Sequence, residues 1–319
     1  MNLLICGVGS IGKRHYNNLK KIGNINLFAY RTNKSTLSDT LEFEKIFYNI
    51  DEIIEYNNFD GVIICNPTSK HIETALSLAS LNCPFFIEKP LGHSMDGVDK
   101  LKEHAENITY VLGYHVLFHP CFKKVKNIVE EGSIGDIISC KAYNGSYLPN
   151  WHPWEDYKKS YASNKSLGGG VILTMTHELN YLTSLFGNVD KCTSMISEKN
   201  ILDIDVDENV EILLKHNSGV ISNIHLNFFQ KNTERWLKII GTDGIIFWDL
   251  WKSEIVMNQE TVKFDKEPIE LLNQSYYDEI KYFLSICGKG NNFEIVKGTT
   301  INDAINDLDI SIKLLENAL

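Results

Sequence analysis

The sequence predicts an α/β fold followed by an α+β fold: a doubly wound parallel sheet first, then an open, mostly antiparallel sheet. Two observations lead to this prediction. Up to about residue 114, short apolar runs alternate with helical stretches, whereas beyond about residue 118 strand-like runs follow one another directly. At 319 residues the chain is also long for a single core, so we expect two domains, residues 1–118 and residues 119–319.

The expected strands of the first domain are short apolar runs with helical segments between them. The runs are NLLIC, NLFAY, KIFY, GVIIC, PFFI and TYVLG, and the clearest helical segments are HIETALSLASL and SMDGVDKLKEHAEN. Strands that alternate with helices pair in parallel, because each crossover helix returns the chain to the same end of the sheet.

The second domain begins with one amphipathic segment, CFKKVKNIVEEG, which is followed by the strand-like runs DIISCKAYNG, ENVEILLKH, GVISNIHLNFF, RWLKIIG and GIIFWDL. Turn sequences such as Asn217-Ser218-Gly219 and Thr242-Asp243-Gly244 separate these runs. Tight turns of this type join antiparallel neighbours. Helical segments at about residues 275–287 and 300–319 close the chain.

Composition excludes several classes of function. A net charge of −10 and a pI near 5.5 argue against a nucleic-acid partner, which lysine and arginine would have to neutralise. No apolar segment is long enough to span a bilayer and no export signal is visible, so we expect no membrane partner and a cytoplasmic location. The 7 cysteines are scattered without Cys-x-x-Cys spacing, and the 10 histidines form no ligand pattern; we therefore expect reduced thiols and no metal.

A glycine motif directly follows the first expected strand. It reads Gly7-Val8-Gly9-Ser10-Ile11-Gly12 and leads into a helix. In a Gly-x-Gly-x-x-Gly turn the first glycine permits the tight turn, the second lets the backbone approach a pyrophosphate, and the third lets helix and strand pack closely. The helix N-terminus then faces the phosphates. This context favours a Rossmann domain that binds a dinucleotide, whereas an unrelated glycine-rich turn is the alternative.

The end of the second expected strand predicts the type of dinucleotide. An NAD-selective site normally places an acidic residue there, but this chain has Arg31, Thr32 and, further on, Lys34. Arg31 can stack on adenine and pair with a 2′-phosphate, with Thr32 or Lys34 adding a donor or a charge. We therefore expect NADP rather than NAD, the alternative being an exposed turn with incidental basic residues.

Further motifs resemble those of the glucose-fructose oxidoreductase, inositol dehydrogenase and MocA family over essentially the whole chain. They are Asn66-Pro67-Thr68-Ser69-x-His71, Glu88-Lys89-Pro90-Leu91, Gly113-Tyr114-His115 leading to His119-Pro120, and Gly168-Gly169-Gly170 leading to His177. The resemblance implies a substrate-binding second domain whose open sheet often mediates oligomerisation. It also implies that Asn66, Pro67 and His71 border the nicotinamide half of the cofactor, and that Glu88 and Pro90 belong to the same binding region.

The resemblance also implies the catalytic residues. Lys89 matches the lysine near the nicotinamide and the substrate hydroxyl, and His177 matches the histidine usually assigned to proton transfer. An imidazole suits that role because it titrates near neutrality. The family commonly has Asp three residues before this histidine, where this chain has Thr174, and another Asp three residues after it, where this chain has Asn180. Thr174 cannot serve as a carboxylate base. The run His-Glu-Leu-Asn-Tyr-Leu is similar to a branch found among sugar-processing oxidoreductases of surface-polysaccharide pathways.

Candidate substrate contacts are His115 near the domain crossover, Thr174 and Asn180, and an aromatic loop with Trp151, Trp154 and Tyr157. Aromatic faces pack against sugar rings or nucleobases, but such loops also fill domain or oligomer interfaces.

Together these features predict an NAD(P)-dependent oxidoreductase that acts on a hydroxyl or keto carbon of a sugar or nucleotide-linked sugar, in surface-polysaccharide or nonulosonic-acid biosynthesis, and forms a homodimer or homotetramer. Two alternatives stay open at this point. One is an enzyme with tightly bound cofactor that oxidises and reduces its substrate in one cycle. The other is a dinucleotide-sensing regulatory protein that has lost turnover, suggested by Thr174.

Overall fold

The structure, a computed structural model, describes residues 1–32, 40–289 and 298–318. The chain forms two compact units. Unit 1 comprises Met1–Tyr114 and Tyr276–Ile305, and unit 2 comprises His115–Ser275 and Asn306–Leu319. The first division lies four residues before the expected boundary at residue 118. The expected division into two contiguous domains placed residues 276–305 in the second domain, whereas the structure places them in the N-terminal unit.

Unit 1 contains a six-stranded sheet whose strands all run parallel, in the order β3-β2-β1-β4-β5-β6. This is the strand order of a dinucleotide-binding doubly wound fold. The strands are β1 (Asn2–Cys6), β2 (Asn26–Tyr30), β3 (Lys45–Phe47), β4 (Gly61–Ile64), β5 (Phe85–Glu88) and β6 (Tyr110–Gly113). The helical segments are α1 (Ser10–Ile22), α2 (Ile50–Tyr56), η1 (Thr68–Lys70), α3 (His71–Ser77), η2 (Ala79–Leu81), α4 (Val98–His104), the end of α8 (Pro268–Leu284) and η8 (Ser285–Lys289).

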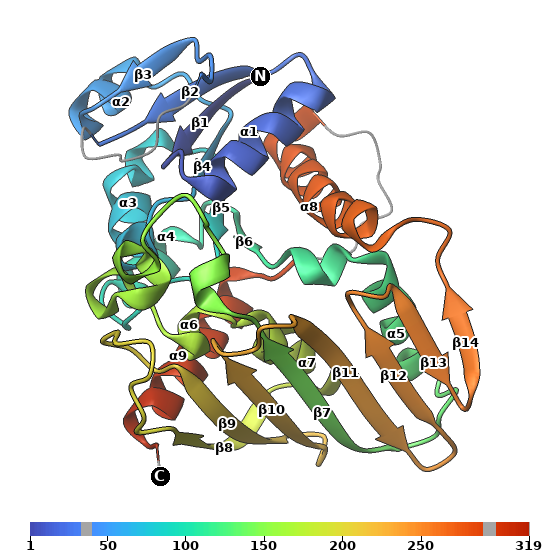
Figure 1. The fold of residues 1–319 in the computed structure, drawn as a ribbon. Coiled ribbons are helices and arrows are strands. Elements are labelled where there is room, and N and C mark those ends of the chain that lie inside the picture. The colour runs from blue at the N-terminus through green and yellow to red at the C-terminus, as the bar shows by residue number, and fades with distance from the viewer. Residues whose placement is uncertain (33–39, 290–297, 319) are drawn as a thin grey trace. The chain divides into compact units, whose positions relative to one another are not determined.

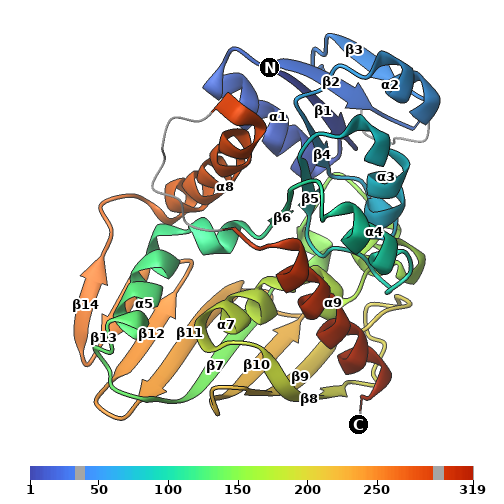
Figure 2. The same ribbon diagram turned by 180° about the vertical axis from the view of Figure 1, so that it is seen from behind.

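The apolar runs of unit 1 form strands that are buried on both faces, except for the edge strand β3. Leu3, Leu4, Ile5 and Cys6 of β1 are all 0% exposed, because helices cover the sheet on both sides. Figures 1 and 2 show α1 and α8 along one face, with α3 and α4 on the other. Ile280 and Phe283 of α8 lie in the same apolar cluster as the residues of β1 and α1. This packing explains why the segment that follows Ser275 rejoins unit 1.

Unit 2 contains an eight-stranded sheet in the order β14-β13-β12-β11-β7-β10-β9-β8. All neighbouring strands are antiparallel except β7 and β10, which pair in parallel. The strands are β7 (Ile137–Gly145), β8 (Val189–Ile196), β9 (Asn209–His216), β10 (Ile221–Asn227), β11 (Glu234–Gly241), β12 (Ile245–Asp249), β13 (Glu254–Met257) and β14 (Glu260–Lys263). The five expected strands are therefore present, and β8, β13 and β14 were not anticipated.

Helices cover one face of this sheet, as Figure 2 shows for α5, α7 and α9. The helical segments are η3 (His115–Phe118), α5 (Pro120–Glu130), η4 (Leu148–Asn150), η5 (Tyr157–Lys159), η6 (Tyr161–Ser163), η7 (Lys165–Leu167), α6 (Val171–Thr174), α7 (His177–Phe186) and the greater part of α9 (Ile301–Glu316). Alternation along β9 follows from this one-sided cover, because Val210, Ile212 and Leu214 are buried while Leu213 between them is 50% exposed.

Candidate functional site

The glycine turn of unit 1 has the geometry that a dinucleotide needs. Gly7 has a positive φ of 93°, and a Cβ there would lie 2.6 Å from the backbone nitrogen of Asn66. A Cβ on Gly12 would lie 2.2 Å from the carbonyl oxygen of Gly7, so helix and strand can approach only without a side chain. A Cβ on Gly9 would meet nothing within 4 Å, which leaves the outside of the turn open. The first turn of α1 carries no acidic residue, so its N-terminal amides suit an anion.

The end of β2 carries the predicted cofactor-selecting residues. The backbone nitrogen of Arg31 donates to the carbonyl oxygen of Phe47 at 3.0 Å, which continues the parallel pairing beyond the strand. The Arg31 guanidinium carbon lies 5.3 Å from the ring centroid of Phe43. Thr32 is exposed, and Lys34 lies outside the described residues. The selection of NADP by these residues stays a prediction.

His71 connects two loops at the carboxyl ends of β4 and β5. Its Nδ1 lies 2.8 Å from the carbonyl oxygen of Pro90, and its Nε2 lies 2.9 Å from the carbonyl oxygen of Asn66. The side chain is buried, and burial lowers the pKa of His71, although the two carbonyl contacts act in the opposite direction. Asn66 Nδ2 donates to Thr74 Oγ1 at 2.7 Å, while Pro67 is exposed. His71 thus holds in register the two segments that the sequence assigned to the cofactor.

The Glu88-Lys89-Pro90 segment follows directly from β5. The Lys89–Pro90 peptide bond is cis. Lys89 is half-buried, and its backbone nitrogen lies 3.3 Å from Glu88 Oε2. Pro90 and Leu91 are buried.

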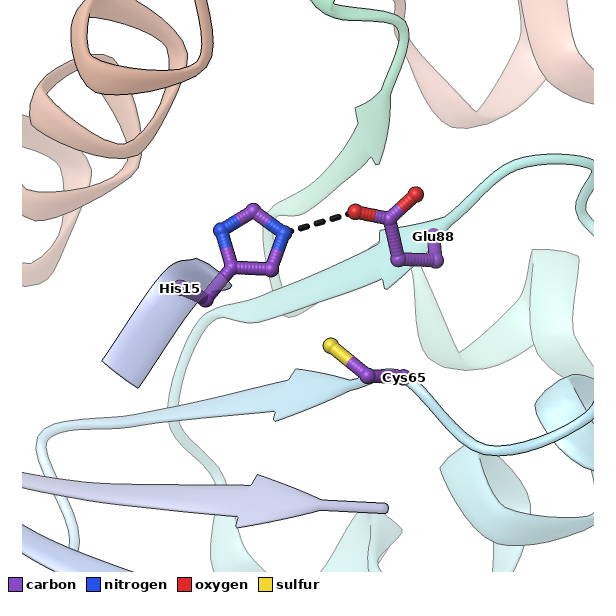
Figure 3. A group of neighbouring side chains, drawn as sticks. All are labelled: His15, Cys65 and Glu88. Atoms are coloured by element: carbon purple, nitrogen blue, oxygen red, sulfur yellow. Dashed lines mark hydrogen bonds and ion pairs between the residues drawn. The ribbon is translucent and has the colours of Figure 1, made fainter. Parts of the chain in front are cut away.

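Glu88 also contacts α1, the helix that follows the glycine turn. His15 Nε2 lies 2.6 Å from Glu88 Oε1, and Cys65 lies beside the pair (Figure 3). His15, Cys65 and Glu88 each offer an atom of a type that binds metals, and these atoms lie within 4.8 Å of one another. A contact of 2.6 Å is a hydrogen-bond distance, and burial raises the pKa of the Cys65 thiol, which therefore stays protonated. We interpret the group as an ion pair or hydrogen bond beside a neutral thiol, and the absence of a metal stays a prediction.

In unit 2, the predicted catalytic histidine begins helix α7 and contacts a second histidine. The rings of His177 and His115 meet edge to face with their centroids 4.6 Å apart, and both side chains are buried. His115 Nδ1 lies 2.9 Å from Ser275 Oγ, whose own hydroxyl donates to the carbonyl oxygen of Leu272 at 2.7 Å. Because that hydroxyl proton is already used, Ser275 Oγ accepts from His115, and the proton of His115 lies on Nδ1.

Asn180 lies about one helical turn after His177 on α7, and its amide is directed at a carboxylate. Asn180 Nδ2 donates to Asp307 Oδ2 at 2.8 Å, and Asp307 Oδ1 lies 3.2 Å from Thr183 Oγ1. The contact of Asn180 with substrate stays a prediction. Thr174, at the end of α6, is buried.

Two carboxylates that the sequence reasoning missed fix the segment around His177. Asp207 Oδ2 accepts from the backbone nitrogen of Ile172 at 2.9 Å, and a Cβ on Gly170 would lie 2.0 Å from Asp207 Oδ1. Glu178 is 0% exposed and pairs with Arg235 at 2.7 Å. An acidic residue directly after His177 is visible in the sequence, whereas nothing local marks Asp207.

The aromatic loop contributes one exposed ring and two anchored rings. Trp151 Nε1 donates to Ser146 Oγ at 2.8 Å, and the Tyr157 hydroxyl donates to the carbonyl oxygen of Leu202 at 3.0 Å. Trp154 is 66% exposed and lies near His152. The first two residues therefore shape the loop, and the substrate role of all three stays a prediction.

Comparisons with known proteins identify the family. The model of the oxidoreductase family with an NAD-binding Rossmann fold matches residues 1–115, and the model of the GFO/IDH/MocA C-terminal domain matches residues 122–247. The chain belongs to the GFO/IDH/MocA oxidoreductase family. It is 27% identical to a myo-inositol 2-dehydrogenase of Thermotoga maritima over 314 residues, which covers 91% of this chain and 89% of the relative.

Solved structures share the fold. A myo-inositol 2-dehydrogenase from Lactobacillus plantarum has a TM-score of 0.81 at 22% identity and covers 100% of this chain and 97% of its own. A levoglucosan dehydrogenase in complex with NADH has a TM-score of 0.82 at 18% identity, with coverage of 100% and 96%. The expected fold class is confirmed, and the chain is a nicotinamide-dependent oxidoreductase. Among the described residues of this family member, no helix combines the length and apolarity that a membrane crossing requires.

Proposed function

We propose that this member of the GFO/IDH/MocA family transfers a hydride between NADP and a carbinol or keto carbon of a sugar, including nucleotide-linked sugars of surface-polysaccharide or nonulosonic-acid biosynthesis. The observation that carries the proposal is the open glycine turn of unit 1, where Gly9 leaves space for a pyrophosphate. Family membership supplies the reaction class, and relatives with the names myo-inositol 2-dehydrogenase and glucose-6-phosphate 3-dehydrogenase support a polyhydroxylated substrate. The comparisons give no support to the regulatory alternative.

The nicotinamide, when bound, accepts or donates the hydride. On our proposal Lys89 donates a hydrogen bond to the substrate oxygen and stabilises negative charge that develops there. His177 takes the hydroxyl proton during oxidation and returns it during reduction. Glu88 and His71 hold the Lys89 segment through the contacts to Lys89 N and to the Pro90 carbonyl oxygen. His115, with its proton on Nδ1, supports the ring of His177.

The NADP preference rests on the absence of an acidic residue at the end of β2 and on the position of Arg31. Homo-oligomerisation through the sheet of unit 2 is supported by exposed apolar residues on the face opposite the helices. These residues are Met195 (62%), Leu213 (50%), Ile221 (52%) and Ile245 (41%).

The test is a turnover assay of the purified protein. We expect a panel of inositols, free sugars and nucleotide sugars, each with NADP and with NAD, to contain a substrate that changes the absorbance of the reduced nicotinamide. The Lys89→Met variant should abolish this change and retain cofactor binding, because the glycine turn is untouched. Loss of cofactor binding in Lys89→Met, or full turnover without the ammonium group, would contradict the assigned role.

A further inference from the structure

A second buried carboxyl group faces the helix that carries His15. Helix α1 and the unit 1 part of α8 lie side by side in both views (Figures 1 and 2). The Arg14 guanidinium lies 4.4 Å from the ring centroid of Tyr276, and Phe86 contacts both His15 and Phe283. Glu279 comes three residues after Tyr276 and four before Phe283, so it lies on the same face of α8, toward α1.

The carboxyl group of Glu279 is buried without a hydrogen-bond partner among the described residues. Its side chain is 0% exposed, and neither carboxyl oxygen has a hydrogen-bond partner within the described part of the chain. Burial, and then the negative charge of Glu88, raise the pKa of Glu279 well above its usual range. Both causes favour the protonated carboxyl group, whose hydroxyl is a donor that needs an acceptor.

His15 has a ring nitrogen that lacks a hydrogen-bond donor among the described residues. The ring is 0% exposed, its Nε2 lies against Glu88 Oε1 at 2.6 Å, and its Nδ1 points away from Glu88 (Figure 3). Nδ1 has no hydrogen-bond partner among the described residues. If Nε2 donates to the Glu88 carboxylate and the ring carries one proton, Nδ1 has a bare lone pair. A buried acceptor without a donor thus lies on the helix that faces a buried donor without an acceptor.

We propose that Glu279 is a positioning residue whose carboxyl group donates a hydrogen bond to His15 Nδ1 through one water, and so fixes the imidazole tautomer whose Nε2 donates to Glu88. The proton stays within the array: Glu279 and His15 each hold one, and Glu88 holds none. The three groups together carry a single negative charge. The same proton count holds if the shared proton moves from Glu279 to Nδ1.

The thiols of Cys65 and Cys6 add no charge to this group of side chains. Burial raises the pKa of the Cys65 and Cys6 thiols, so both stay neutral. Arg14 is directed over the ring of Tyr276.

The group formed by Glu279, His15 and Glu88 contacts the segment of the proposed catalytic lysine through Glu88. Glu88 Oε2 lies 3.3 Å from the Lys89 backbone nitrogen, and a Cβ on Gly113 would lie 2.9 Å from that same oxygen, so the glycine at position 113 leaves room for the carboxylate. Loss of the donor at Glu279 should therefore loosen the His15 ring, then the Glu88 carboxylate, then the Lys89 segment. The effect on turnover rests on the proposed function, whereas the tautomer of His15 does not.

The first test is therefore spectroscopic and needs no substrate. The ¹⁵N shifts of the His15 ring, assigned with His15→Gln, should show a protonated Nε2 and a hydrogen-bonded Nδ1 in the wild-type protein. Glu279→Gln, whose amide still donates, should retain this pattern. Glu279→Leu and Glu279→Met, which fill similar space without a donor, should shift the Nδ1 signal to that of an unbonded ring nitrogen. An unchanged His15 spectrum in a folded Leu or Met variant would overturn the proposal.

The second test separates positioning from simple stability. We expect Glu279→Gln to retain kcat within about threefold, and Glu279→Leu to lower kcat at least about tenfold, with the KM for cofactor changed less than about threefold. Thermal midpoints are measured alongside. If Glu279→Gln loses as much kcat as Glu279→Leu at equal stability, a negative charge rather than a proton is required, and the proposal fails. If no substrate is found for the wild-type protein, the ring shifts of His15 still decide the proposal.

Discussion

The rings of His115 and His177 meet edge to face, with their centroids 4.6 Å apart and an interplanar angle of 79°. Ser275 accepts the Nδ1 proton of His115, so this ring is fixed in one tautomer beside the proposed proton-transfer residue. Two imidazoles this close do not readily carry two charges, because like charges at that distance repel. The contact therefore disfavours a state in which both rings are protonated at once.

His177→Ala should reduce kcat by about 10²-fold, because it removes the proposed proton acceptor. The affinity for NADP should change less than about twofold, because no residue of the glycine turn is altered. Steady-state kinetics and cofactor titration by nicotinamide fluorescence check both values. His115→Asn, which removes the ring contact but leaves His177, is the control. It should lower kcat less than His177→Ala does. A larger loss in the control would assign the proton transfer to His115 instead.

Gly9→Ala and Gly12→Ala should separate cofactor binding from stability. A methyl group on Gly9 meets nothing within 4 Å, so the fold tolerates it, but it occupies the space intended for the pyrophosphate. We expect the cofactor affinity to fall at least about tenfold with an unchanged thermal midpoint. A methyl group on Gly12 would lie 2.2 Å from the Gly7 carbonyl oxygen, and such overpacking costs about 1–3 kcal/mol. Equal binding of NADP by wild-type protein and Gly9→Ala would contradict the placement of the pyrophosphate.

Local patterns were sufficient to predict the parallel sheet of unit 1. Except for the edge strand β3, each strand is a short apolar run because both faces are buried, and each run is followed by turn residues or a helix. The return of α8 to unit 1 was not predictable in this way. The apolar positions Ile280 and Phe283 indicate a buried helix face, but only the folded chain shows which core receives it. Strand β14 was missed because ETVK has no buried residue and so no apolar alternation.

The sequence predicted the site residues as separate motifs, but not how they are joined. Cys65 follows β4, Glu88 ends β5 and His15 lies on the helix after β1, and these three strands are neighbours in the sheet. The carboxyl ends of neighbouring parallel strands meet at one edge, so this cluster was accessible from the predicted topology. Asp207 was not, because its contacts with Ile172 and Gly170 join segments 35 residues apart or more that share no motif.

Arg31→Ala should shift the preference from NADP toward NAD. A guanidinium at the end of β2 can pair with the 2′-phosphate in a charge-assisted contact, whereas NAD has only a hydroxyl at that position. We expect kcat/KM for NADP to fall at least about tenfold, with kcat/KM for NAD changed less than about threefold. Arg31→Lys retains the charge but not the planar pair of donors. Its kcat/KM for NADP should therefore lie between those of the wild-type protein and Arg31→Ala. An unchanged ratio of the two specificity constants in Arg31→Ala would refute the assignment.

Leu213→Glu should dissociate an oligomer that forms through the sheet of unit 2. Leu213 is 50% exposed on β9, on the face opposite the helices, so a carboxylate there is harmless in a monomer but would be desolvated in an interface. Light scattering coupled to size exclusion should give a larger mass for the wild-type protein than for the variant. Tyr48→Glu, at an exposed residue of unit 1, is the control and should keep the wild-type mass. A monomeric wild-type protein would rule out this interface.

The stability of the protein should fall as the pH is lowered through the titration range of His119. This residue caps helix α5, because its Nδ1 accepts from the backbone nitrogen of Cys121 at 3.2 Å. Burial, and then the positive charges of Arg235 and Lys123, lower the pKa of His119 from 6.5 to about 4. Since the folded pKa is depressed, the unfolded chain binds a proton first. The stabilisation is therefore complete above pH 6.5 and is lost as the pH falls toward 4.

The His119→Asn variant isolates this effect. Asparagine retains an oxygen that can accept from Cys121 N, but it does not titrate. One pKa unit corresponds to about 1.36 kcal/mol. As the pH falls through the range between the two pKa values, the free energy of unfolding of the wild-type protein should therefore fall by up to about 3 kcal/mol more than that of the variant. Urea midpoints at about pH 7.5 and about pH 5 measure the difference. His71 and His216, whose pKa values burial also lowers, are present in both proteins and cancel in the comparison. Parallel losses in the two proteins would show that His119 is not held neutral by its surroundings.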